Sequence, residues 1–148
     1  MAELERKGQD ARFCEIMQRI GHLYEEYAKS KGMTYMSMCI LEAICTTPDN
    51  CTQKCICEET HYPKQSVNLI VKSFWQAGYI TLEELPADRR NKRIILTEKG
   101  QDYAARTVAP LWKIDEGATQ CLREDLLRLL SIYARAYEDG VKRAAGMP

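Results

Sequence analysis

An amphipathic helix followed directly by a hairpin with a basic tip is the feature that most limits how this chain can fold. Apolar side chains recur in residues 64–77 at the three- and four-residue spacing of one helix face. These are Val67, Ile70, Val71 and Phe74. Gly78 then stands where a helix commonly ends in a left-handed residue. Two short strand-like stretches then flank a turn over residues 86–91, and in the first of them Ile80 and Leu82 alternate with Thr81 and Glu83, which predicts a β-hairpin.

The opposite face of the predicted helix is polar. Gln65, Asn68 and Lys72 are three and four residues apart, so they share one side of the helix. Lys64 and Ser66 flank that side near the helix N-terminus. Glutamine and asparagine can pair with adenine through two hydrogen bonds, and lysine can bind guanine or phosphate. This pattern favours a DNA-contacting helix, with an ordinary solvated surface as the alternative.

The predicted hairpin tip is strongly basic. One acid, Asp88, is accompanied there by four cations, which are Arg89, Arg90, Lys92 and Arg93. Such a cluster packs poorly but suits phosphates or the minor groove of DNA. A solvated charged turn is the alternative. The helix and the hairpin in tandem favour DNA more than either does alone.

Length and composition indicate a folded protein of one domain, residues 1–148. The chain is 45% hydrophobic and 28% charged, has no apolar signal core and has no apolar run long enough to span a membrane. We therefore expect a cytoplasmic protein with no membrane partner. The formal net charge is zero, but residues 61–78 hold two lysines and no acid, so a phosphate-binding surface is compatible with the neutral total.

Helical periodicity predicts further helices on both sides of this segment. Thr34 and Thr52 are plausible N-caps for two of them, and a bend at Pro110 and an interruption at Gly117 are expected later in the chain. The last helix is apolar on more than one side, which a second subunit would cover. The expected helices are residues 9–30, 34–46, 53–60, 98–116 and 119–145.

Three blocks of the sequence carry a resemblance to a known family. Residues 52–60 and 63–80 form two of them, and the third combines Asp88-Arg89-Arg90 with Leu96-Thr97-Glu98-Lys99-Gly100. Together they resemble the MarR family (multiple antibiotic resistance regulators), which are dimeric winged helix-turn-helix transcription factors. The first two blocks resemble its DNA-reading helix pair, and the third resembles its wing with the Asp-x-Arg and LTxxG signatures. The order of elements matches over nearly the whole chain.

The resemblance implies a mainly α fold with a small β-hairpin wing. Residues 34–100 would form the winged-helix DNA-binding lobe, and residues 8–31 and 101–146 would form dimerisation helices. The partners would be a second copy of the chain and double-stranded DNA with a pseudo-palindromic operator.

The resemblance also assigns roles to individual residues. Gln65, Ser66, Asn68 and Lys72 would face the major groove, with Lys64 beside them. Arg90 would enter the minor groove, braced by Asp88, within the basic group formed with Arg89, Lys92 and Arg93. Thr52, Gln53 and Lys54 would approach backbone phosphates. Leu69 and Ser73 stand where many relatives carry polar or basic residues, so the base preference of the family cannot be carried over.

The seven cysteines are odd in number and follow no export signal, so free thiols are expected. Cys51, Cys55, Cys57 and His61 invite a zinc hypothesis. The spacing is not that of a standard zinc motif, and Cys55 and Cys57 would project about 200° apart on a helix. We expect neither a metal nor another cofactor.

A redox sensor is a second alternative. Some members of the family sense peroxide through a cysteine near tyrosines in the first long helix. Cys14 with Tyr24, Tyr27 and Tyr35 is a loose match to that arrangement. Nothing in the sequence indicates a lowered thiol pKa.

A small-molecule effector is a third possibility that the resemblance implies, because a crevice in the family often binds phenolic or other aromatic compounds. Plain core packing is the alternative for each candidate. The candidate pocket residues are His22, Tyr24, Tyr35, Met38, Cys39 and Trp112.

The sequence therefore predicts a dimeric, sequence-specific DNA-binding transcriptional regulator, a repressor released by a small-molecule effector. Two alternatives stay open: a redox- or metal-responsive regulator of the same fold, and a winged-helix protein-interaction module that does not bind DNA, which the zero net charge favours. No catalytic constellation is visible, so an enzyme is not expected.

Overall fold

The computed structural model describes residues 8–49, 51–85, 88–122 and 124–147. The chain divides into two compact units, residues 1–109 and 110–148. The first holds α1 (Gln9–Ser30), α2 (Tyr35–Thr46), α3 (Gln53–Thr60), α4 (Lys64–Gln76), β1 (Ile80–Leu85), β2 (Asp88–Leu96) and α5 (Glu98–Thr107). The second holds most of α6 (Ala109–Gln120) and all of α7 (Glu124–Ala145). Among the described residues, no helix is both long and apolar enough to cross a bilayer.

Threonine is the N-cap of three helices in the first unit, α2, α3 and α5. The hydroxyl of Thr34 accepts a hydrogen bond from the backbone N–H of Ser37, and Thr52 accepts one from Cys55 in the same way. Each hydroxyl satisfies a backbone donor that has no partner inside the helix. The expected N-caps of α2 and α3 are therefore confirmed. Gly78 has a φ of 74°, which confirms the expected left-handed residue after α4.

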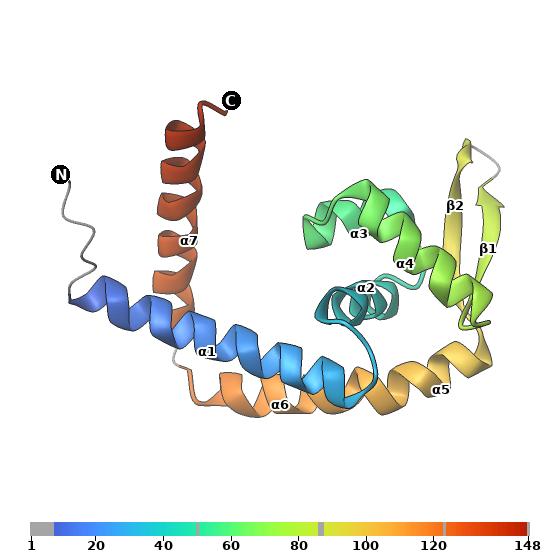
Figure 1. Ribbon diagram of the computed structural model, residues 1–148, viewed down its shortest axis with the longest axis horizontal. Coiled ribbons are helices and arrows are strands. Elements are labelled where there is room, and N and C mark those ends of the chain that lie inside the picture. The colour runs from blue at the N-terminus through green and yellow to red at the C-terminus, as the bar shows by residue number, and fades with distance from the viewer. Residues whose placement is uncertain (1–7, 50, 86–87, 123, 148) are drawn as a thin grey trace. The chain divides into compact units, whose positions relative to one another are not determined.

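Helix α2 is the centre of the first unit. It contacts α1, α3, α4, α5 and β2, and Figure 1 shows it between the α3–α4 pair and α5. Its side chains Met38, Ile40, Leu41 and Ile44 are at most 1% exposed. Each such burial contributes roughly 1.5–3 kcal/mol. The core around α2 thus fixes α3 and α4 relative to each other.

The two strands form an antiparallel hairpin in which Ile80 pairs with Leu96 and Leu82 pairs with Ile94. A mainly helical fold with a small hairpin was predicted and is confirmed. The expected turn over residues 86–91 was too long, because β2 already begins at Asp88. The outer rungs that extend the ladder are charged pairs. Glu83 stands opposite Arg93 and Glu84 opposite Lys92, and such cross-strand pairs stabilise a sheet.

The hairpin is tied to the start of α3. Thr52 forms an isolated antiparallel bridge with Arg93, and the N–H of Ile94 donates to the carbonyl of Cys51 at 2.8 Å. These contacts hold the hairpin at a fixed position beside the α3–α4 pair.

The Thr97–Gly100 segment locks α5 to the end of α4. The Thr97 hydroxyl donates to the carbonyl of Gly78 at 2.7 Å and accepts from the N–H of Gly100 at 3.0 Å. Lys99 donates to the carbonyl of Ala77 at 2.7 Å. Gly100 is buried, and a Cβ at this position would collide with the carbonyl of Tyr79. Only glycine fits there, which explains why the Leu96–Gly100 block ends in glycine.

The expected single helix over residues 98–116, bent at Pro110, was wrong. Helix α5 ends at Thr107 and α6 begins at Ala109. Proline has no N–H, and its ring clashes with the carbonyl four residues earlier, here that of Arg106. The helix therefore ends before the proline, and Pro110 lies in the first turn of α6, where proline is tolerated.

Two further expectations for the C-terminal part were wrong. Gly117 does not interrupt a helix but lies inside α6, and the last helix begins at Glu124 instead of Thr119. The Thr119 hydroxyl donates to the carbonyls of Asp115 and Glu116 at 2.8 and 3.0 Å, so it bonds backwards within α6 and caps nothing.

Helix α7 has no buried side chain in this single chain. Large apolar residues at three- and four-residue spacing form a stripe along it, defined by Leu126, Leu130, Tyr133, Tyr137 and Val141, which are 37–61% exposed. Helix α1 also exposes large apolar side chains, namely Ile16, Met17, Ile20 and Leu23. Apolar surface of this extent marks an interaction site.

Candidate nucleic-acid interface

Helix α4 has one buried face and one exposed face. Val67, Val71 and Phe74 are 0%, 1% and 7% exposed, as the periodicity predicts, whereas Ile70 is only half-buried. The outer face of α4 carries Gln65, Asn68, Leu69 and Lys72, all of them exposed. Ser66 is half-buried at its margin.

A side-chain hydrogen bond joins α3 to the outer face of α4. The Nε2 of Gln53 donates to the Oδ1 of Asn68 at 3.3 Å. Gln53 was expected at a backbone phosphate, and the structure brings it to a residue expected at the bases. The bond orients the Asn68 amide, whose N–H groups remain available as donors.

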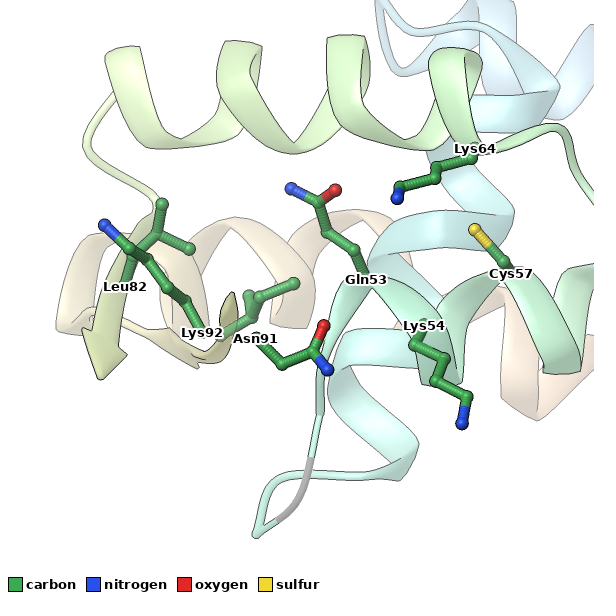
Figure 2. Close-up of a pocket in the computed structure, with 8 residues that line it drawn as sticks. Gln53, Lys54, Cys57, Lys64, Leu82, Asn91 and Lys92 are labelled. Atoms are coloured by element: carbon green, nitrogen blue, oxygen red, sulfur yellow. The ribbon is translucent and has the colours of Figure 1, made fainter. Parts of the chain in front are cut away.

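A cavity of about 390 Å³ opens beside these residues, and we call it the lysine cavity (Figure 2). Helix α3, the first residue of α4 and both strands of the hairpin contribute to its wall. The lining residues are Gln53, Lys54, Cys57, Lys64, Leu82, Asn91, Lys92 and Ile94.

The lysine cavity is rich in positive charge. In Figure 2 the ammonium groups of Lys64 and Lys92 lie on either side of the Gln53 amide, and Lys54 lies below it on α3. Lys54 forms an ion pair of 3.7 Å with Glu58, but both side chains are mostly exposed, so water screens the pair. Ammonium groups and amides are the donors that proteins direct at phosphate oxygens.

Two residues expected at DNA already have structural partners. Thr52 caps α3, and the guanidinium of Arg93 forms a 2.7 Å ion pair with Glu83 on the facing strand. Neither contact prevents an additional bond to phosphate, because a guanidinium carries five N–H donors.

The side chains of Asp88, Arg89 and Arg90 lie outside the described residues. The backbone of these three residues belongs to β2. The assignment of Arg90 to the minor groove, braced by Asp88, stays a prediction.

Sequence reasoning missed four lining residues of the lysine cavity. Leu82 and Ile94 were expected in strands, but the sequence does not give the register of the two strands. In the structure Ile94 stands directly opposite Leu82, so both side chains reach the cavity. Asn91 was assigned to a turn, and Cys57 was not among the residues expected at DNA. The alternation of apolar and polar residues in the first strand marked Leu82 as inward-facing, whereas nothing local placed Ile94 or Asn91 at the cavity.

The expected effector residues are only partly brought together. The rings of Tyr24 and Tyr35 lie 5.8 Å apart, while His22 is exposed and pairs with Glu26 on its own helix at 3.5 Å. Trp112 belongs to the second unit.

Met38 and Cys39 lie on α2, three and four residues after Tyr35. Met38 is 1% exposed and belongs to the core. Cys39 is half-buried and is hydrogen-bonded to the hydroxyl of Tyr62. Burial, and then this hydrogen bond, raises the pKa of Tyr62 above its ordinary value, so the phenol keeps its proton.

The seven cysteines are free thiols. Burial raises the pKa of both Cys45 and Cys51 to about 11, so neither is a thiolate at neutral pH. In the part of the chain that the structure describes, no three His, Cys, Asp or Glu side chains gather to hold a metal, and this includes the Cys51–His61 segment. Tyr27, one of the tyrosines considered for redox sensing, donates its hydroxyl to the carbonyl of Thr107 at 2.9 Å.

Known proteins share this fold. A MarR family regulator from Neisseria meningitidis, NMB1585, matches with a TM-score of 0.76 and 22% identity over 93% of this chain and 99% of its own. The PcaV transcriptional regulator from Streptomyces coelicolor, solved in complex with its natural ligand, matches with a TM-score of 0.69 and 17% identity over 95% and 99% of the two chains. The transcriptional regulator MOSR from M. tuberculosis, solved in complex with DNA, matches with a TM-score of 0.60 and 19% identity over 90% and 98%.

At these identities the structural matches establish the fold. No curated protein matches the sequence. Residues 31–91, which include α2, α3, α4 and β1, match the family model described as MarR family. Over this segment the chain is similar to the MarR family, and it shares the fold of solved MarR family regulators.

Proposed function

We propose that this protein is a dimeric, sequence-specific DNA-binding transcriptional regulator that a small molecule releases from its operator. The observation that carries the proposal is the outer face of α4 beside the lysine cavity. Residues 61–78 hold Lys64 and Lys72 and no acid, and the cavity adds Lys54 from α3 and Lys92 from β2. A surface on which amides and cations predominate attracts a polyanion, even though the whole chain is neutral.

The proposed binding mode follows from the geometry of this surface. Helix α4 would enter the major groove, with Gln65, Asn68 and Lys72 at base edges. The lysine cavity would receive a backbone phosphate between Lys64 and Lys92. The wing, with Arg90 near its tip, would follow the adjacent minor groove. The complex of MOSR with DNA shows that a protein of this fold can dock on a duplex.

Dimerisation is proposed from the apolar stripe of α7 and the exposed apolar side chains of α1. A second copy of the chain would cover these surfaces. Two copies related by a two-fold axis would present two α4 helices to two half-sites, which predicts a pseudo-palindromic operator.

Release by an effector is the least direct part of the proposal. PcaV, which shares the fold, was solved with its natural ligand. An effector that binds better to a spacing of the two DNA-binding lobes that does not fit the operator would shift the dimer toward that spacing and release it from the DNA. The expected effector is a small aromatic compound that binds near Tyr24 and Tyr35.

Selection of duplexes from a random-sequence pool tests DNA recognition and identifies the operator sequence in the same experiment. We expect enrichment of one inverted-repeat sequence whose affinity falls steeply as salt rises. Arg90→Ala should weaken binding to that duplex, and Lys142→Ala on α7 serves as the matched control for loss of a cation. If no sequence is enriched at low salt, the regulator proposal fails and the protein-interaction alternative takes its place.

A further inference from the structure

We propose that Leu69 is a specificity residue that contacts the 5-methyl group of a thymine in the operator. The inference rests on the proposed DNA-binding function and adds a base preference to it. Leu69 is 69% exposed, more than any other large apolar side chain among the described residues. An apolar side chain this exposed on the outer face of α4 would gain free energy from an apolar partner in the groove that the helix enters.

Leu69 lies near the centre of the outer face. It follows Gln65 by four residues and precedes Lys72 by three, so it is a surface neighbour of both. The buried side chains Val67 and Val71, two residues before and after it, point to the core. A helix that inserts its outer face into the major groove therefore brings Leu69 to the base edges.

The surroundings of Leu69 distinguish it from the other exposed apolar residues. On α7 each exposed leucine of the stripe has apolar neighbours one turn away. Leu69 has only polar ones, because the residues three and four positions away are Gln65, Ser66, Lys72 and Ser73. A protein-docking surface would need an apolar patch, whereas this is one apolar group among hydrogen-bonding groups.

The major groove offers a matching surface. Its only apolar feature is the methyl group of thymine, which stands among hydrogen-bond donors and acceptors. Helix α4 carries two lysines, Lys64 and Lys72, and no acid, so its positive charge favours docking on DNA. Gln65 and Asn68 beside Leu69 suit adenine. The combination predicts a half-site with an A·T pair and a thymine whose methyl group Leu69 covers.

Uracil in place of thymine tests this contact, because uracil keeps every hydrogen bond and removes only the methyl group. The probes are the duplex enriched by wild-type protein and its variants with one thymine per half-site changed to uracil. We compare wild type, Leu69→Ala and Leu69→Met, with Ser73→Ala as a control on the same exposed side of α4.

We expect one thymine per half-site at which uracil weakens wild-type binding about fourfold per half-site, the loss of one buried methyl group. Leu69→Ala should bind the thymine duplex more weakly and should show no further loss on uracil. Leu69→Met should keep the sensitivity to uracil, and Ser73→Ala should behave as wild type. Because Leu69 is exposed, the alanine variant should fold, which circular dichroism verifies.

Two results would overturn the inference, and they differ in what else they affect. If wild type and Leu69→Ala lose affinity equally on every uracil duplex, Leu69 touches no methyl group while DNA binding stands. If the random pool yields no enriched duplex, the proposed function fails and this inference fails with it.

Discussion

Helices α2 and α7 are both rich in apolar residues, yet α2 is largely buried and α7 is exposed. Five of the 12 residues of α2 are buried, whereas none of the 22 residues of α7 is. Helix α2 finds its partners within the first unit, in α1, α3, α4, α5 and β2. The apolar stripe of α7 has no comparable cover in the single chain.

This difference teaches that the two regions have different requirements. The winged-helix lobe completes its core within one chain, so the outer face of α4, which we propose as the DNA-binding surface, is positioned before any partner binds. The apolar side chains of the α7 stripe become buried only when a further surface covers them. The comparison is therefore tested by substitutions that change either the stability of the lobe or the assembly through α7, but not both.

The largest effect is expected from a charge in the α7 stripe. Leu130→Glu would place an unpaired carboxylate in the proposed dimer interface, which costs about 3 kcal/mol or more. The dimer dissociation constant should rise at least about 100-fold, as measured by sedimentation equilibrium. The lobe should keep its unfolding transition.

Ser131→Glu is the matched control, because it introduces the same charge on the same helix outside the stripe. It should leave the dimer dissociation constant within a few-fold of wild type. Equal dissociation constants for Leu130→Glu and wild type would show that α7 does not form the interface.

Glycine-to-alanine substitutions compare the packing of the two units directly. Gly100→Ala in α5 would drive a Cβ into the carbonyl of Tyr79 and should lower the free energy of unfolding by about 3 kcal/mol. Gly117→Ala in α6 meets no atom within 4 Å and should raise helix stability by up to about 1 kcal/mol. Urea titration of both variants measures the pair. Two changes of the same sign would contradict the packing described here.

High pH should weaken the lobe through Cys51. Its pKa is raised from 9.0 to about 11 in the folded protein, so the thiol ionises first in the unfolded chain. The stability that the buried thiol contributes is complete below pH 9 and is lost as the pH rises from 9 to 11. Between pH 8 and 10 wild type should lose about 1.4 kcal/mol more than Cys51→Ala.

Cys121→Ala provides the comparison from the second unit, because Cys121 is exposed. This variant should lose stability with pH as wild type does. If Cys51→Ala and wild type follow the same pH curve, the thiol of Cys51 is more hydrated than its burial indicates.

The smallest effect is expected from one lysine of the cavity. Lys92→Ala should reduce the magnitude of the slope of log K against log salt by about 0.9 for each bound chain, the value for one phosphate contact, and so by about 1.8 for the dimer. Lys142→Ala, on α7, should leave the slope unchanged. A Lys92→Ala slope equal to that of wild type would remove the lysine cavity from the DNA interface.

Local signals in the sequence were sufficient for most of the fold. Thr34 and Thr52 marked helix starts correctly, and the apolar spacing of α4 identified its buried face. The errors arose where one residue type has two uses. Pro110 can bend a helix or lie in the first turn of one, and Thr119, expected at the start of the last helix, lies inside α6 and bonds backwards within it.

The candidate site was predictable only in part, for a different reason. The outer face of α4 depends on helical period alone, so Gln65, Asn68 and Lys72 were found. The lysine cavity depends on the bridge between Thr52 and Arg93, which joins segments far apart in the chain. No local pattern shows which strand residues will face α3, and Asn91 was therefore missed.

The number of chains bound per duplex tests the central claim most directly. Sedimentation velocity with the selected duplex, labelled and at low salt, measures this stoichiometry. The account predicts two copies of the chain on one inverted repeat, with loss of the complex at high salt and weakened assembly for Leu130→Glu. One chain per duplex, or no complex at low salt, would contradict it.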